Sequence, residues 1–283
     1  IMIYQEQIMQ IAQKMAGFSL ARADILRKAM SDKNYEEIHS LEEEFIAGAI
    51  KNGHTKEKAK HVFALIERFA DYGFNKAHSV SYAMVAYEMA YFKAHYPLVF
   101  YRQLLSSILG NDQKTQDYLD EMRFRQIKLV SVNINVSEED YVLKDNALIL
   151  PLNLVKGISR QTAFIVKKER EEKGLYKDFI DAISRLSLQG LSRHHFLALI
   201  HAGAFDVFTT RRQSLEASLD GALGYTRLIT VEKDGKKMLN PSLVSSPKME
   251  IVEENLQERL QAEKDALGFY FSEHPSTVLQ KKH

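Results

Sequence analysis

The stretch from Tyr72 to Pro97, YGFNKAHSVSYAMVAYEMAYFKAHYP, is the most informative part of the chain, because it is predicted to form one long helix that is apolar on most of its sides. At helical spacing it shows three stripes, which are Val80, Met84, Tyr87 and Tyr91; Tyr82, Val85, Met89 and Phe92; and Ala83, Ala86, Ala90 and Ala94. A helix with so little polar surface is predicted to be buried. Its N-terminal end is polar and carries Asn75, Lys76, His78 and Ser81. Free N–H groups and the helix dipole favour an anion there, although a core helix with a polar entry loop would show the same pattern.

Composition is that of a globular protein with more than one domain. The chain has 283 residues, of which 45% are hydrophobic and 27% charged. It contains no run of apolar residues long enough to span a membrane and no signal-like start. The absence of cysteine excludes disulfides and thiolate metal sites and fits a reducing, cytoplasmic setting. The net charge is +1, so any affinity for nucleic acid has to come from local clusters. Because the sequence opens on Ile1 in mid-element, we expect a fragment of a longer protein.

Helical spacing and caps organise residues 1–127. Helices are predicted to end at Gly17, Gly53, Gly73 and Gly110, and Ser19 and Thr55 are predicted N-caps. A last helix of this set is expected over residues 113–126.

The period changes after residue 127. Residues 129–136 and 141–150 alternate and are rich in β-branched side chains, which predicts a short hairpin or small sheet with a turn at Lys144, Asp145 and Asn146. Short helices are predicted over residues 159–173, 179–186, 192–201 and 211–224. Residues 225–248 indicate a long loop or tether, and a charged helix is expected over residues 250–266.

A first cluster of cations lies on and after the predicted second helix and consists of Arg22, Arg27, Lys28 and Lys33. If the helices pack antiparallel, these cations come within reach of Lys76 and His78. Convergent guanidinium and ammonium groups suit a triphosphate or a nucleic-acid backbone. However, Asp24 stands three and four residues before Arg27 and Lys28, so ordinary helix-surface ion pairs explain both cations as well.

A second cluster begins at Leu154-Val155-Lys156-Gly157-Ile158-Ser159 and continues into a helix with several lysines. A glycine, an apolar residue and a small residue before a helix are typical of the hairpin in a helix-hairpin-helix. The N–H groups of such a turn bind one DNA phosphate, which gives no sequence specificity. A plain helical hairpin with Gly157 as a C-cap is the alternative.

The histidines do not indicate a metal enzyme. His54, His61, His194, His195 and His201 form no HExxH or comparable ligand pattern. We also find no strand-borne pair of aspartates, no GxSxG, no P-loop and no GxGxxG. Two-metal phosphoryl transfer needs clustered carboxylates, which this sequence does not show. Because the histidines form no ligand pattern, a histidine-based metallohydrolase is the least supported function.

Six strings of the sequence resemble the alpha subunit of bacterial DNA polymerase III, the family C replicative DNA polymerase. In order, they are MIYQEQIMQIAQKMAGFSL, ADILRKAM, GFNKAHSVSYA, AYFKAHYP, ALIHAGAFD and LGFYFSEHP. The resemblance covers nearly the whole chain. It implies that the first part is a fingers domain and that a helix-hairpin-helix region and a linker follow. It also implies that the palm, with its catalytic aspartates and Mg2+, lies before Ile1 in the full-length enzyme.

The resemblance also implies site residues. Those implied to line the groove for the incoming dNTP and the template-primer end are Arg27, Lys28, Asn75, Lys76, His78 and Tyr82. Those predicted to bind DNA at the helix-hairpin-helix are Lys156, Gly157, Ser159, Arg160 and Lys167. Two departures from the family are Ala21-Arg22 in place of Gly-Glu and Ser31-Asp32-Lys33 in place of Gly-Lys-Lys. We find no sliding-clamp peptide between Asp206 and Ala266, and the oligonucleotide-binding barrel that would follow is absent.

The sequence therefore predicts a mainly α fold with four segments. These are a helical fingers domain over residues 1–127, a β connection over 128–150, a helix-hairpin-helix domain over 151–224, and a linker with a C-terminal helix over 225–283. We predict a fragment of a DNA-directed DNA polymerase that binds dNTP and template-primer DNA but is inactive alone. In the full-length protein we expect Mg2+, a sliding clamp and other replisome subunits as partners, no membrane, and a cytoplasmic, nucleoid-associated location. A non-catalytic helical DNA-binding or scaffold protein is the alternative.

Overall fold

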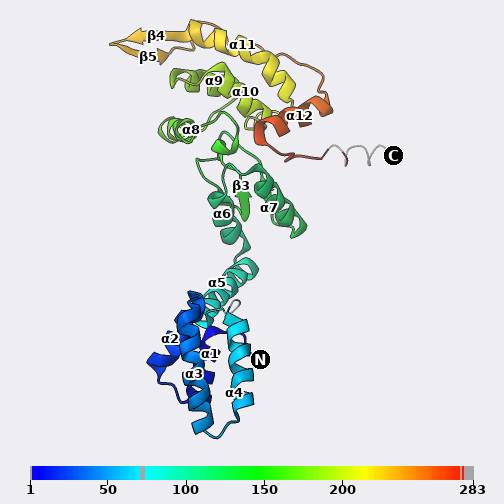
Figure 1. The fold of residues 1–283 in the computed structure, drawn as a ribbon. Helices are drawn as coiled ribbons and strands as arrows, with labels where there is room; N and C mark the ends of the chain where they lie inside the picture. Colours follow the sequence, from blue (N-terminus) through cyan, green and yellow to red (C-terminus); the bar gives the residue numbers. More distant parts are fainter. Residues whose placement is uncertain (1, 71–73, 275, 277–283) are drawn as a thin grey trace. The chain divides into compact units, whose positions relative to one another are not determined.

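The computed structural model describes residues 2–70, 74–274 and 276. Helices dominate this described part, so the mainly α prediction is confirmed (Figure 1). None of the helices described is long and apolar enough to cross a membrane. The chain forms two compact units, Ile1–Tyr91 and Phe92–His283.

The first unit is a group of packed helices. Its elements are α1 (Gln5–Ala16), α2 (Leu20–Ser31), α3 (Tyr35–Lys51), α4 (Lys56–Ala70) and the greater part of α5 (Lys76–His95). The core of α1 to α4 contains Leu26, Leu41, Phe45, Phe63 and Ile66. The predicted caps are confirmed, because the Ser19 hydroxyl accepts a hydrogen bond from the Arg22 N–H and Gly17 has a φ of 70°. Gly73, predicted to end α4, lies outside the described residues.

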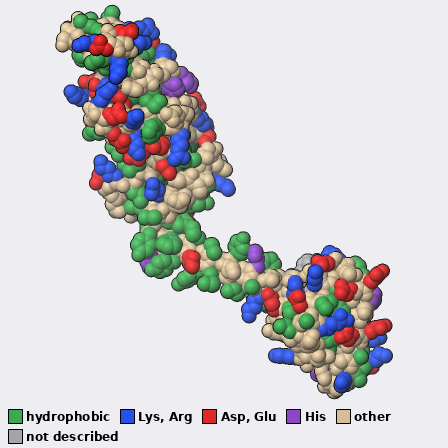
Figure 2. Space-filling model, turned by 90° about the vertical axis from the view of Figure 1, so that its left-hand side faces the viewer, with side chains coloured by type: hydrophobic (Ala, Val, Ile, Leu, Met, Phe, Trp, Pro, Cys, Tyr) green, Lys and Arg blue, Asp and Glu red, His purple; other side chains and the backbone are tan. Residues whose placement is uncertain are grey.

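Helix α5 differs from the sequence prediction. Its bounds are as expected, but none of its described residues is buried. Tyr87 is 73% exposed and Met84 is 60% exposed, and Figure 2 shows hydrophobic side chains gathered along this helix. Burial of an apolar helix needs a second apolar surface, and α5 makes no extensive contact with α1 to α4. The prediction that α5 is buried is therefore wrong for this chain.

The second unit begins with helices that pack on a small sheet. Its first elements are α6 (Pro97–Ser107), α7 (Asp112–Phe124), β1 (Leu129–Val130), β2 (Val142–Lys144) and β3 (Ala147–Ile149). Strand β3 is central, antiparallel to β2 and parallel to β1, and the predicted turn between β2 and β3 is confirmed by the positive φ of Asp145 and Asn146. Tyr101 of α6 and Leu119 of α7 lie in the same core as Leu148. The two units divide at Tyr91, whereas the sequence predicts a boundary near residue 127. The division lies earlier because α6 and α7 belong to this core.

A set of short helices follows in the second unit. They are the 3-10 helix η1 (Leu152–Leu154), α8 (Arg160–Lys173), α9 (Phe179–Leu188), α10 (Arg193–His201) and α11 (Arg212–Ile229). Aromatic side chains join them, and the Phe179 and Phe205 rings meet edge to face at 5.3 Å. The predicted end of α11 at Gly224 is wrong. The helix continues because Ile229 is buried and the Thr226 hydroxyl bonds to that of Ser184 in α9 at 2.9 Å.

The predicted long loop after residue 225 contains a β ribbon. Strands β4 (Thr230–Lys233) and β5 (Lys236–Leu239) are antiparallel and are joined by Asp234-Gly235, both with positive φ. This is the two-residue turn that an Asp-Gly pair favours.

The last helix is α12 (Leu256–Leu267), which begins later than predicted. Glu250 and Val252 are not helical, since their N–H groups donate to the hydroxyls of Ser218 and Ser214 on α11. The helix starts instead after Asn255, whose side chain accepts hydrogen bonds from the first free N–H groups.

Candidate functional site

The N-terminus of α5 holds an anion, as its position predicts, but the anion is a side chain of the first unit. The Lys76 N–H donates to both carboxylate oxygens of Glu6 at 3.0 Å. Burial alone would raise the pKa of Glu6, but the backbone hydrogen bonds from Lys76 and Ala77 outweigh it and lower that pKa. The Asn75 side chain accepts from the His78 N–H at 2.9 Å and caps the helix.

Aromatic rings line the first turns of α5. The His78 ring lies between Phe74 and Tyr82, with centroid distances of 5.4 Å and 4.4 Å. The Lys76 ammonium is 6.0 Å from the centroid of the Tyr4 ring. Tyr82 is 65% exposed, so this surface offers both a π face and a cation to a ligand.

The cations of α2 are partly neutralised. Arg27 Nε lies 2.8 Å from the carboxylate of Asp24, which is the ordinary i,i+3 pair that the sequence left open. Arg22 forms an ion pair with Glu44 of the neighbouring helix α3. Lys28 is exposed and has no ion-pair partner among the described residues.

The first turn of α1 connects these two groups. Gln5 Nε2 donates to the Ser31 hydroxyl, which in turn donates to the Arg27 carbonyl. The neighbouring Glu6 binds Lys76. The structure thus brings the α2 cations and the N-terminus of α5 to one end of α1, although the Arg27 and Lys76 side chains have no direct contact there.

The predicted hairpin before α8 is present. Gly157 has a φ of 87°, and the Ser159 hydroxyl caps α8 by accepting from the Thr162 N–H at 3.0 Å. The N–H groups of Gly157, Ser159 and Arg160 have no acceptor among the described residues. They are available for an external oxygen anion.

Two of the predicted hairpin cations are occupied. The Lys156 N–H donates to the Ala266 carbonyl at 2.8 Å, and its ammonium lies 3.1 Å from Asp112. Lys167 is 2.8 Å from Glu138, and this hydrogen bond raises the pKa of Lys167. The structure therefore brings Lys156, Gly157, Ser159 and Arg160 into one turn and places Lys167 in a separate ion pair.

A second hairpin was missed by the sequence analysis. Residues 188–193, LQGLSR, repeat the pattern of residues 155–160, VKGISR, before α10. Gly190 has a φ of 92°, and the Ser192 N–H donates to His195 Nδ1 at 3.0 Å. The repeated Gly-apolar-Ser-Arg string is the signal that could have revealed it.

The two hairpins touch. A β-carbon placed on Gly157 would lie 2.9 Å from His194 Nε2, so the first residues of α10 lie directly on the turn before α8. Arg193 is held by Asp220 of α11, at 2.8 Å. The N–H groups of Gly190 and Ser192 are bonded to Ser187 and His195, so the turn before α10 offers fewer free N–H groups than the turn before α8.

A buried ion network secures this region. Arg212 Nη1 lies 2.9 Å from Glu263 of α12, and the other oxygen of Glu263 accepts from the Phe271 and Ser272 N–H groups. Arg212 also binds Asp206 at 2.7 Å. The strings ALIHAGAFD and LGFYFSEHP are thus joined in space, although Pro275 lies outside the described residues.

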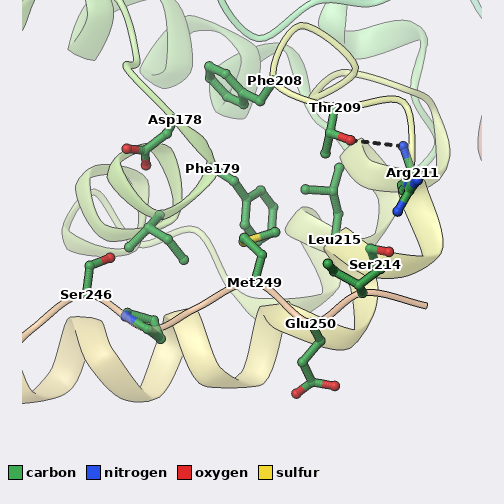
Figure 3. A pocket seen from close by; sticks show the side chains of 13 residues that line it. Asp178, Phe179, Phe208, Thr209, Arg211, Ser214, Leu215, Ser246, Met249 and Glu250 are labelled. Carbon is green, nitrogen blue, oxygen red and sulfur yellow. Dashed lines mark hydrogen bonds between the residues drawn. The ribbon is translucent and has the colours of Figure 1, made fainter.

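An apolar cavity of the second unit lies beside α11. Its volume is about 540 Å3, and it is lined by the start of α9, the turn before α11 and residues 246–251. Figure 3 shows Met249 extending toward Phe179 and Glu250 pointing away from the cavity. Polar side chains at its edge include Asp178, Thr209, Arg211 and Ser214, and the segment that returns to α12 covers it.

Metal ligands are not assembled in the described residues, where no group of three or more His, Asp or Glu side chains could hold an ion.

Comparison with known proteins gives family matches for two parts of the chain. Residues 1–53 match a family model described as the bacterial DNA polymerase III alpha subunit finger domain, and residues 126–215 match a helix-hairpin-helix motif. The chain is 39% identical over 275 residues to a protein named DNA polymerase III subunit alpha from Staphylococcus epidermidis, which covers 97% of this chain and 26% of that protein. A protein of the same name from Staphylococcus aureus is also 39% identical, over 277 residues. The chain spans about a quarter of the length of the curated relatives that it matches.

Proposed function

Because the chain belongs to the family of bacterial DNA polymerase III alpha subunits, we propose that it acts as part of a DNA-directed DNA polymerase by holding duplex DNA and the incoming nucleotide. The observation that carries the DNA part of this proposal is the pair of touching Gly-apolar-Ser-Arg hairpins. The turn before α8 supplies the free N–H groups of Gly157, Ser159 and Arg160, which suit the sugar-phosphate backbone and not the bases.

The nucleotide part rests on the cluster at the start of α5. A triphosphate would be bound by Lys76 and Lys28, and its base or sugar would lie against the rings of His78 and Tyr82. Arg27 and Asn75 orient this surface through their hydrogen bonds. Such groups act by positioning the substrate and by neutralising charge on the leaving pyrophosphate. Glu6 then occupies the phosphate position until a nucleotide displaces it.

The catalytic carboxylates and Mg2+ belong to another part of the polymerase in this proposal. Mg2+ would supply the neutralisation of phosphate charge that two-metal transfer requires. The chain by itself is expected to be inactive. A sliding clamp, further replisome subunits and a nucleoid-associated place in the cytoplasm complete the proposal for the full-length protein.

Binding of the purified chain to duplex DNA of two unrelated sequences, over a range of salt concentrations, tests the proposal. We expect equal affinity for the two sequences and a steep fall with salt, because phosphates and not bases are bound. Strong preference for one sequence, or no binding at low salt, would contradict it. Binding to DNA without a nucleotide-dependent change at Lys76 in the longer polymerase would favour the non-catalytic alternative.

A further inference from the structure

The β4–β5 ribbon carries an uncompensated basic face. Lys233 and Lys236 are directly opposite one another, and Val231 and Met238 form the next pair on the same face. The other face has Glu232 opposite Lys237, which balances its charge. Both Lys233 and Lys236 are exposed and lack an ion-pair partner among the described residues. Like charges directly opposite destabilise a sheet, so this pair of lysines does not stabilise the ribbon.

The ribbon is fixed to its unit at both ends. Strand β4 follows α11 directly, and the Asn240 N–H closes the ribbon by donating to the Ile229 carbonyl at 2.7 Å. The returning segment is bound to α11 through Ser214 and Ser218. The lysines are therefore presented on an anchored element and not on a free loop.

The face of α11 that leads to the ribbon also passes the second hairpin. Asp220 holds Arg193 of that hairpin, and Arg227 lies two turns further along, close enough for its charge to act on Asp220. Figure 1 shows β4 and β5 continuing outward from the end of α11. Nine helical residues and four strand residues separate Asp220 from Lys233, which places the lysines about 27 Å beyond the hairpin. That distance corresponds to about 8 base pairs of duplex DNA.

We propose that the Lys233 and Lys236 face of the ribbon binds the phosphate backbone of the duplex that the two hairpins hold, about 8 base pairs away from them. This inference rests on the proposed function. An acidic protein surface would also attract two lysines. DNA is favoured for two reasons. The cations lie in one direction from the hairpins, in the order Arg193, Arg227 and the two lysines. A two-stranded ribbon also fits the major groove of DNA.

The test compares the double variant K233A/K236A with two controls in the full chain. K128A/K144A removes the same charge from two exposed lysines of the other sheet region, one just before β1 and one at the end of β2, and K237A alters the opposite face of the ribbon. Affinity is measured by fluorescence anisotropy over a salt titration, on DNA stem-loops of about 6 and about 20 base pairs. The shorter stem is shorter than the distance of about 8 base pairs between the hairpins and the lysines.

We expect K233A/K236A to weaken binding to the long stem and to make the slope of log K against log salt shallower by roughly 1.8, since each phosphate contact contributes about 0.9. On the short stem it should equal the wild type, and K128A/K144A should equal the wild type on both. An unchanged salt slope for K233A/K236A on the long stem would overturn the proposal and would point to an acidic protein as the ligand. An equal loss of affinity in K128A/K144A would overturn it as well. Both results would leave binding by the hairpins intact. Failure of the wild type to bind either stem would instead overturn the proposed function, and the ribbon proposal with it.

Discussion

Glu6 of α1 caps the N-terminus of α5 through the Lys76 N–H, which lies 3.0 Å from each of its carboxylate oxygens. The two residues are far apart in sequence, and the contact fixes the start of the apolar helix to the first turn of the chain. A carboxylate is a good substitute for a phosphate at this position, because the same N–H groups and helix dipole bind both.

Glu6→Gln is expected to strengthen binding of a triphosphate to the first unit and to weaken the attachment of α1 to α5. The neutral amide competes less with phosphate and loses the charge-dipole interaction, which is on the order of 0.5 kcal/mol at an exposed site. Fluorescent nucleotide binding and hydrogen exchange of the Lys76 amide measure the two effects. Glu36→Gln, at an exposed glutamate in the first turn of α3, is the matched control and should change neither.

The effect on stability should depend on pH. The pKa of Glu6 is lowered in the folded protein, so its contribution is fully present above the ordinary glutamate pKa and is lost as the pH falls through the lowered pKa. Slower exchange of the Lys76 amide in wild type than in E6Q is therefore expected near neutral pH and should vanish in acid. A difference that grows with falling pH would contradict this assignment.

Lys76→Ala in the longer polymerase is expected to raise the KM for dNTP or lower kcat by roughly 10- to 150-fold, because a lost charge-assisted contact costs about 1.5 to 3 kcal/mol. Arg27→Ala should have a smaller effect, since Asp24 already neutralises Arg27. Steady-state kinetics with Lys60→Ala as the control, an exposed lysine of α4, make the comparison. Equal kinetics for K76A and wild type would show that the cation of Lys76 only stabilises the helix start.

The sequence predicted most local structure because local structure depends on nearby residues. Ser19, Gly17 and Gly157 act as the caps and turn that their types favour. Contacts between residues far apart in the sequence were not predicted. The Glu6 cap joins residues that no spacing rule relates, and the exposure of α5 depends on whether another surface covers it.

Two misses had usable local signals. Asp234-Gly235 is a favoured hairpin turn, but lysine-rich strands with little alternation resembled a loop. The second hairpin at Gly190 repeats the Gly-apolar-Ser-Arg string of residues 157–160, and this repeat is a signal in the sequence itself. For α11, the extension beyond Gly224 follows from packing against α9 through Thr226, which overrides the glycine.

Glu263→Ala is expected to destabilise the second unit by about 3 kcal/mol or more. The change leaves Arg212 with one carboxylate partner fewer in a buried site and removes the acceptor for the Phe271 and Ser272 N–H groups. Urea unfolding followed by circular dichroism measures the loss. Glu258→Ala, on the exposed face of the same helix, should stay within about 0.5 kcal/mol of wild type. A similar small effect for E263A would show that Asp206 alone satisfies Arg212.

Gly157→Val is expected to reduce duplex DNA binding more than Lys156→Ala. Valine is strained at a φ of 87°, and its side chain would meet the His194 ring, so both hairpins would be displaced. Lys156 is already paired with Asp112, and its loss should remove at most one phosphate contact, which lowers the salt slope by about 0.9. Anisotropy with labelled duplex DNA over a salt titration measures both variants.

The control for backbone strain is Gly174→Val, because Gly174 has a φ of 83° but no neighbour near its β-carbon position. It should lose stability to a similar extent and retain DNA affinity, since it lies at the far end of α8 from the hairpin. Gly190→Val should resemble G157V if the second hairpin shares the duplex. Loss of affinity in G174V equal to that in G157V would mean that unfolding explains the effect. Wild-type affinity in a folded G157V would mean that the hairpins serve packing and not DNA binding.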